Sequence, residues 1–166
     1  MSTMDAESTA AIDFAVAANR DDGEWTVSAL PPRAATELDV LLRALGQLPS
    51  DVGTIGMVSV DEDFFLLARV SGVHVRLLLS DVGAATESPL ARAVVERLEL
   101  PPPDDDDDQM QPAGDLGILA DLGLSAMDLG AMCDDNELYP DELLGDIAAR
   151  LGFGEAFDEV LDAVLA

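Results

Sequence analysis

The sequence contains no lysine, a single histidine, a single cysteine and few aromatic residues, which make up 4% of its 166 residues. The absence of lysine excludes Schiff-base catalysis and the lysine-dependent phosphate sites of P-loop and kinase-type enzymes. One cysteine and one histidine, Cys133 and His74, exclude an internal disulfide and a zinc site built from these two residue types. The composition therefore removes several enzyme classes and favours a binding role.

Basic residues are scarce as well. Eight arginines face 34 acidic residues, which gives a formal net charge of −26 at pH 7. A protein that binds nucleic acid directly needs a basic face to displace counterions from phosphates, so this charge argues against direct nucleic-acid binding. The apolar share of 49% is that of a globular protein, and the length predicts one domain, or one domain with a small appendage.

A long hydrophobic run is also missing. The longest apolar stretch, Phe64 to Leu79, is interrupted by Arg69, His74 and Arg76, and it falls short of a membrane span. The first residues are small and acidic, unlike a secretory signal. We therefore expect a cytoplasmic protein that has no contact with membranes.

The acidic residues are concentrated toward the end of the chain. Residues 101–166 carry 18 acids and one basic residue, Arg150. The change in composition falls at Pro101-Pro102-Pro103, which is followed by five carboxylates, Asp104, Asp105, Asp106, Asp107 and Asp108. Consecutive prolines favour extended polyproline II, and adjacent carboxylates repel one another. The pattern predicts a disordered N-terminus over residues 1–10, a sheet domain over 11–100, an acidic linker over 101–113 and a helical region over 114–166.

Residues 11–100 alternate between strand and helix patterns. The predicted strands are Ile12 to Ala18, Trp25 to Leu30, Thr54 to Val60, Phe64 to Val70 and Val73 to Leu79. An apolar stripe of four leucines between Leu38 and Leu45 predicts one helix, and Ser88-Pro89 predicts the start of another.

The resulting order, ββαβββα, predicts an α+β fold with a five-stranded antiparallel sheet whose two helices cover one face. Profilin-like, longin-like and roadblock-like proteins share this order, and most of them are binding scaffolds.

Residues 114–166 predict a cluster of short helices. Leu116, Leu119 and Leu122 form a stripe that stops at Gly123, and Ser125 resembles a helix cap. Pro140 opens a longer helix that ends at Gly152, and an amphipathic stripe from Phe157 to Leu165 follows it. These helices are too short for a deep core of their own, so they should pack together or on the sheet.

No residue pattern predicts a catalytic centre, a cofactor or a metal site. His74 has no partner for a catalytic triad and is expected on the solvated face of its strand. Cys133 lies among acids, which disfavour a reactive thiolate, and is expected to be a small buried residue. The aspartate run lacks the spaced ligands and central glycine of an EF-hand loop.

The run Asp104 to Asp108 is the candidate partner-binding site. Dense carboxylates can imitate phosphate spacing and dock on a basic protein surface, with fast and salt-sensitive association. The alternative is that the run only keeps the chain soluble.

Several longer strings are similar to one known family. They are GMVSV at 56–60, DFF at 63–65, VRLLLSDV at 75–82, PAGDL at 112–116, LYPDELL at 138–144 and RLGFGEAF at 150–157. They resemble the actinobacterial tRNA adenosine deaminase-associated proteins, from about Asp13 to about Phe157. The resemblance implies a gene beside that of a tRNA adenosine deaminase and implies no catalytic residues. The chain is not itself a zinc deaminase, because His74 is followed by Val75 and Arg76 and Cys133 stands alone.

These observations predict a non-enzymatic acidic protein that binds or regulates a tRNA adenosine deaminase or another basic protein. One alternative is a self-associating scaffold that forms a homodimer. The other is a hydrolase that uses carboxylates alone, with a pocket into which acids converge.

Overall fold

The structure is a computed structural model and describes residues 12–48, 50, 52–60, 62–82, 88–99, 112–134 and 138–165. In chain order the elements are β1 (Ile12–Asp21), β2 (Glu24–Leu30), the 3-10 helix η1 (Pro32–Ala35), α2 (Leu38–Gly46), β3 (Thr54–Val60), β4 (Phe64–Ser71), β5 (His74–Leu79), α3 (Pro89–Arg97), β6 (Ala113–Gly114), the 3-10 helix η3 (Ala120–Leu122), α4 (Ala126–Cys133), α5 (Pro140–Leu151) and α6 (Gly154–Leu165). The α+β class predicted from the sequence is confirmed.

The sheet has six strands in the order β2-β1-β3-β4-β5-β6, and every neighbouring pair is antiparallel. The prediction of five strands was therefore wrong by one. The additional strand, β6, is only two residues long and pairs Ala113 and Gly114 with Leu79 and Leu78. Two residues are too few to show the alternating pattern by which a strand is predicted from sequence. The position of β6 is set by its pairing with β5.

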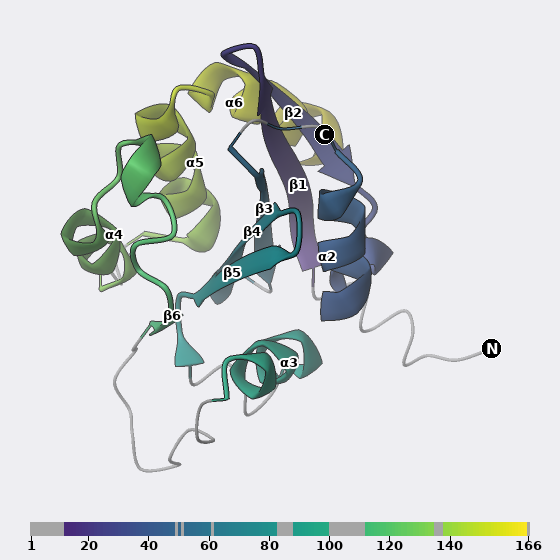
Figure 1. The fold of residues 1–166 in the computed structure, drawn as a ribbon, viewed down its shortest axis with the longest axis vertical. Coiled ribbons are helices and arrows are strands. Elements are labelled where there is room, and N and C mark those ends of the chain that lie inside the picture. The colour runs from purple at the N-terminus through teal and green to yellow at the C-terminus, as the bar shows by residue number, and fades with distance from the viewer. Residues whose placement is uncertain are drawn as a thin grey trace.

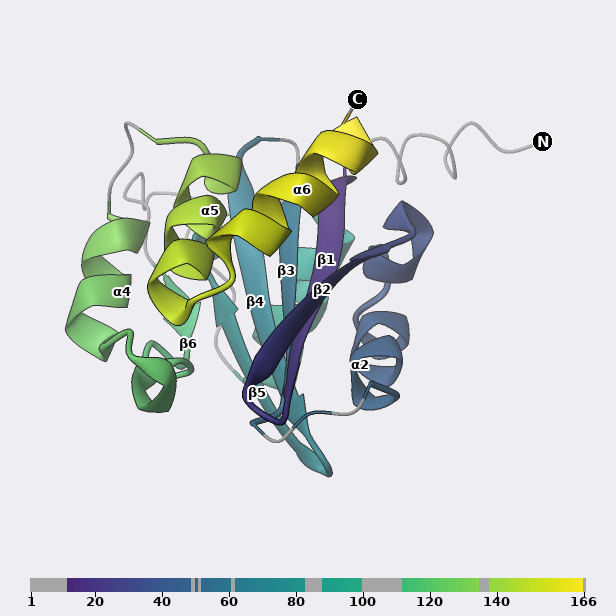
Figure 2. The same ribbon diagram turned by 90° about the horizontal axis from the view of Figure 1, so that it is seen from above.

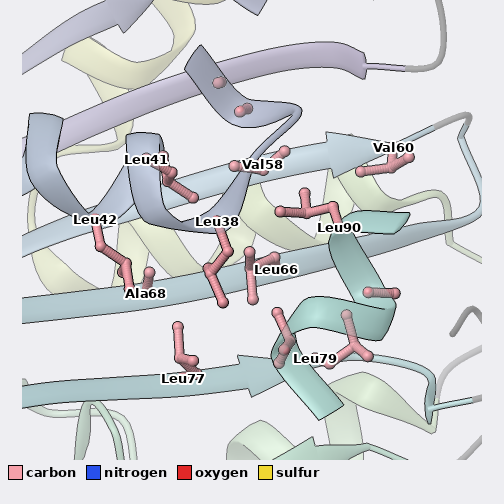
Figure 3. Close-up of a cluster of buried hydrophobic side chains, with 14 of the residues drawn as sticks. Leu38, Leu41, Leu42, Val58, Val60, Leu66, Ala68, Leu77, Leu79 and Leu90 are labelled. Atoms are coloured by element: carbon pink, nitrogen blue, oxygen red, sulfur yellow. The ribbon is translucent and has the colours of Figure 1, made fainter. Parts of the chain in front are cut away.

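One face of the sheet is covered by α2 and α3 (Figure 1). The four leucines of the predicted stripe, Leu38, Leu41, Leu42 and Leu45, are all buried there. Figure 3 shows Leu38, Leu41 and Leu42 facing alternate residues of the strands, among them Val58, Leu66, Ala68 and Leu77. This face forms the first of two hydrophobic cores.

Gly56 explains how closely α2 approaches the centre of the sheet. A side chain at this position of β3 would place its Cβ 2.8 Å from a methyl carbon of Leu45. Cβ atoms essentially never approach that closely, so with any larger residue at position 56 the side chain of Leu45 would have to shift. Leu45 is fully buried.

The other face of the sheet is covered by α4, α5 and α6, so the molecule has three layers (Figure 2). The two helices predicted within residues 11–100 thus cover one face, as expected, and the C-terminal helices, which were expected to pack together or on the sheet, cover the other face. Side chains of the second core come from β1, β3 and β4 and from the C-terminal helices; they include Phe14, Met57, Leu67, Leu144 and Phe157. Burial on both sides explains why all seven residues of β3 are buried.

The predicted starts and ends of the helices are largely confirmed. The hydroxyl oxygens of Ser88 and Ser125 accept hydrogen bonds from the backbone of Ala91 and Asp128, at 3.3 Å and 3.2 Å. Each hydroxyl thereby satisfies one otherwise unpaired N–H group in the first turn of its helix. At the end of α5, Gly152 adopts the left-handed conformation with φ of 107°, which a glycine tolerates best.

The turn between β4 and β5 lies one residue later than predicted. Ser71 pairs with His74, so the two turn residues are Gly72, with φ of 63°, and Val73. Val73 is therefore not part of the strand, and its side chain is 92% exposed.

The predicted linker and N-terminus fall mostly outside the described residues. Residues 1–10 and 101–111 are among those that the structure does not describe, whereas Ala113, placed in the linker by the sequence, is buried in β6. Within the described ranges, no helix combines the length and the apolar character needed to cross a bilayer.

Candidate partner-binding surface

The predicted site, Asp104 to Asp108, lies outside the described residues, so the structure assigns it no geometry. Its two flanks are placed. α3 ends at Arg97 on one face of the sheet, and the chain resumes in β6 at the edge strand beside β5. The run is thus connected at both ends to folded elements.

A second acidic feature is present in the described residues, on the outer side of α4, α5 and α6. The segments 126–134 and 138–165 contain one arginine, Arg150, and nine acids, all of them exposed: Asp128, Asp134, Asp141, Glu142, Asp146, Glu155, Asp158, Glu159 and Asp162. We call this set the acidic helical face. It lies on the layer seen at the left and front of Figure 2.

The amphipathic pattern of the helices explains this face. In α5 the apolar residues Leu143, Leu144, Ile147 and Leu151 are buried against the sheet, which leaves the acids to solvent. Asp141 and Glu142 lie in the first turn of α5, where the positive end of the helix dipole stabilises them.

The helices on the opposite face have a different charge balance. α2 and α3 carry two acids, Asp39 and Glu96, against three exposed arginines, Arg43, Arg92 and Arg97. Among the described helices, the acids are therefore concentrated on α4–α6, on one side of the sheet.

Two arginines from neighbouring strands hold the C-terminal layer on the sheet. Arg69 of β4 and Arg76 of β5 are directly paired in the strand register. Both contact the segment that connects β6 to α4, and we call them the arginine clamp.

Arg69 is the buried member of the clamp, with 6% of the residue exposed. Its guanidinium donates to the Val52 carbonyl at 2.8 Å and 2.6 Å, to the Ile118 carbonyl at 2.7 Å and to both carboxylate oxygens of Asp121 at 2.6 Å and 2.9 Å. All five N–H donors are thereby satisfied, as a buried guanidinium requires. The hydrogen bond from Arg69 lowers the pKa of Asp121 below its ordinary value of 3.8.

Arg76 is the more exposed member. Its Nε donates to Asp115 at 2.6 Å and its second guanidinium nitrogen donates to the Gly117 carbonyl at 2.7 Å. Asp115 in turn accepts the backbone N–H of Gly117 at 2.9 Å, which closes a tight turn. The clamp therefore fixes where the acidic helical face begins.

A groove opens where the turn between β1 and β2 meets the corner between α5 and α6. Its volume is about 660 Å³, and its lining includes Glu24, Trp25, Gly152, Phe153 and Glu155. The rings of Trp25 and Phe153 lie 4.7 Å apart between centroids and are tilted by 48°. The groove borders the acidic helical face, because Glu155 belongs to both.

Cys133 and His74, the two residues weighed for chemistry, show no reactive arrangement. Cys133 is 1% exposed within the second core, and burial raises the pKa of its thiol to about 12. The prediction of a buried residue is confirmed. His74 is exposed, as expected, but for a different reason: it lies at the hairpin end of β5, whereas the middle of that face is covered by helices.

Within the described ranges, no group of three or more histidine, cysteine, aspartate or glutamate side chains is arranged to hold a metal ion. The groove is open, and both of its glutamates are exposed. The convergent acids that a carboxylate-dependent hydrolase requires are therefore not found in it.

Comparison with known proteins identifies the family. The family model for Rv3753c-like tRNA adenosine deaminase-associated proteins matches residues 13–154. The chain belongs to this family. It is 38% identical over 151 residues to Protein Rv3753c of Mycobacterium tuberculosis, an alignment that covers 90% of this chain and 87% of that protein.

The family match runs from the first strand to the start of α6, and it includes both members of the arginine clamp and most of the groove. No solved structure matches the chain, so the likeness to profilin-like, longin-like and roadblock-like proteins stays a prediction.

Sequence reasoning did not identify the clamp or the groove. Arg69 and Arg76 interrupt an apolar run, and an arginine in a buried strand must find carboxylates or carbonyls. This requirement could have predicted that both arginines bind acceptors from another segment of the chain. Trp25 and Phe153 lie far apart in sequence, and nothing local indicates that they meet.

Proposed function

We propose that this chain is a non-enzymatic acidic protein that binds a tRNA adenosine deaminase, or another basic protein, through its acidic helical face. The observation that supports this most is the concentration of nine exposed acids and one arginine on α4–α6, opposite helices with a small basic excess. The choice of partner rests on the family, which is named for association with a tRNA adenosine deaminase.

The physical basis is electrostatic complementarity. A protein that holds tRNA needs a basic surface for the phosphate backbone, and an acidic face can dock on such a surface. The same field repels nucleic acid and accelerates association with a basic protein, in a salt-dependent manner. The acidic face is suited to competing with tRNA for a basic groove.

The run Asp104 to Asp108 extends this surface in the proposal. Exposed charge pairs contribute about 0–1 kcal/mol each, so five more carboxylates would change the association rate and its salt dependence more than the final affinity. The acidic helical face supplies the fixed geometry, and the run supplies additional long-range attraction.

The test mixes the purified chain with the tRNA adenosine deaminase of the same organism at low salt, with size-exclusion chromatography and deamination of tRNA as readouts. One variant removes four of the nine negative charges of the face by changing Asp146, Asp158 and Asp162 to Asn and Glu159 to Gln. Its matched control makes the same charge change on the opposite side: Glu37, Glu96 and Glu99 to Gln and Asp39 to Asn. We expect the first variant to lose affinity by about tenfold or more and the control to lose about twofold or less.

A chain that neither co-elutes with the deaminase nor alters its rate would refute the proposal. Equal losses in the two fourfold variants would show that only the net charge matters, and would remove the acidic helical face as the binding site. Replacing Asp104 to Asp108 by Asn tests the run separately. It should slow association several-fold and leave folding intact.

A homodimeric scaffold remains the second candidate, because β2 is an edge of the sheet and β1 is its only strand partner among the described residues. An open edge strand can pair with a second copy. Since the net charge of −26 opposes self-association, a true dimer should tighten as salt rises. Sedimentation that shows only monomer at low and high salt would reject it.

A further inference from the structure

The groove at the corner between α5 and α6 is built from an aromatic pair and glycine backbone. Trp25, from the start of β2, packs on Phe153, which lies between the two helices. A Cβ at Gly154, the first residue of α6, would lie 3.0 Å from the Cα of Ala149, so the corner is as tight as the backbone allows. Glycines at this corner leave one side of the groove without bulky side chains.

Carboxylates flank the aromatic pair, and the lining contains no basic residue. Glu24 precedes Trp25, and Glu155 lies in the first turn of α6; both are exposed. The N-terminus of a helix by itself attracts anions, but Glu155 already supplies a negative charge there. Asp158 and Glu159, one turn further along α6, add to the negative field.

Trp25 already contacts one guanidinium within the chain. The Cζ atom of Arg20, its cross-strand partner in β1, lies 5.6 Å from the centroid of the indole ring. Arg20 does not line the groove, so the groove remains open to a second cation. A guanidinium stacks on aromatic rings better than an ammonium does, because it is planar and weakly hydrated.

We propose that this groove receives an arginine side chain from an exposed segment of the basic partner, held between Trp25, which the buried Phe153 supports from below, and the carboxylates of Glu24 and Glu155. A volume of about 660 Å³ accommodates that side chain together with neighbouring backbone. This inference rests on the proposed function and adds to it a specific anchor, since hot spots of interfaces are desolvated aromatic and arginine residues surrounded by weaker contacts.

Trp25 is the only tryptophan of the chain, so its fluorescence reports on the groove directly. The probe is acetylated tetra-arginine amide, with the corresponding tetra-lysine peptide for comparison. We expect tetra-arginine to change the emission of Trp25 saturably and to bind several-fold more tightly than tetra-lysine. Equal affinities would overturn the aromatic part of the proposal.

A matched pair of variants separates the groove from the rest of the face. Glu155→Gln and Glu159→Gln remove the same charge from the same helix, but only Glu155 lines the groove. We expect Glu155→Gln to weaken tetra-arginine binding about three- to tenfold and Glu159→Gln to weaken it less than about twofold. Circular dichroism confirms that each variant is folded.

The outcomes distinguish this proposal from the one on which it rests. If the deaminase binds while the Trp25 emission stays constant and the two variants behave alike, the acidic helical face is the binding surface and the groove is not an anchor. If neither the deaminase nor tetra-arginine binds, the proposed function fails too. An emission change that depends on the protein concentration alone, with a dimer in sedimentation, would assign the groove to a second copy and overturn the proposal.

Discussion

Replacing Arg69 by Met should destabilise the protein strongly, because the guanidinium is buried and all its donors are used. The substitution leaves the carbonyls of Val52 and Ile118 without their partner. Removing one member of a buried ion pair costs about 3–5 kcal/mol, and the lower end applies here because Asp121 is 58% exposed and regains water. For a domain of this size, a loss of about 3 kcal/mol lowers the melting temperature by about 6–12 °C.

The assay is urea denaturation of the wild type, Arg69→Met, Asp121→Asn and the double variant, completed as a double-mutant cycle. Since the carboxylate is half-exposed, we expect a coupling energy of about 1 kcal/mol. Arg43→Met is the control: Arg43 is an exposed arginine of α2, and its replacement should change the free energy of unfolding by less than about 0.5 kcal/mol. A loss in Arg69→Met as small as that of the control, or additive losses in the cycle, would refute the reasoning.

Three further predictions concern Gly114, Cys133 and Asp121. Gly114→Ala should destabilise the protein and open the edge strand β6, because Gly114 has φ of 117° and a Cβ there would clash with the Leu77 carbonyl; denaturation and amide exchange of β5 measure both effects. Cys133 should resist thiol reagents until the protein unfolds, since it is 1% exposed and the pKa of its thiol is raised to about 12. If the folded protein in low urea reacted with the reagent as fast as the unfolded protein does, this prediction would be wrong. Finally, the pKa of Asp121 is lowered by Arg69, so the carboxylate stabilises the fold above its ordinary pKa of 3.8 and this stabilisation is lost as pH falls through the lower folded-state pKa. The stability difference between the wild type and Asp121→Asn should therefore shrink below pH 3.8, and a difference that is constant from pH 7 to pH 3 would show that the charge has no part in it.

Much of the first core could be predicted from local pattern. The leucine stripe of α2 has helical spacing, and Gly152 marks the end of α5, because both signals act within one element. The sequence also contains a signal for the second helical layer. Thr54–Val60 and Phe64–Val70 are almost continuously apolar, which is typical of strands that are covered on both faces.

The sixth strand and the arginine clamp could not be predicted from local sequence patterns. β6 exists because residues 113 and 114 meet β5, and no local pattern shows that contact. Likewise, the chain contains 34 acidic residues that could pair with Arg69, and the sequence does not indicate that the partner is Asp121. The acidity of the C-terminal helices was visible in the sequence, whereas their packing as one layer on one face of the sheet required the structure.

The composition of the second core determines when this core can fold during synthesis. It joins the first strand to the last helix: the ring of Phe14 packs edge-to-face on that of Phe157, with 5.9 Å between their centroids. During synthesis β1 leaves the ribosome well before α6, so this face of the sheet lacks the cover of α6 until that helix has emerged. The second core therefore cannot be completed before α6 is available, and until then the uncovered strands are a binding surface for chaperones.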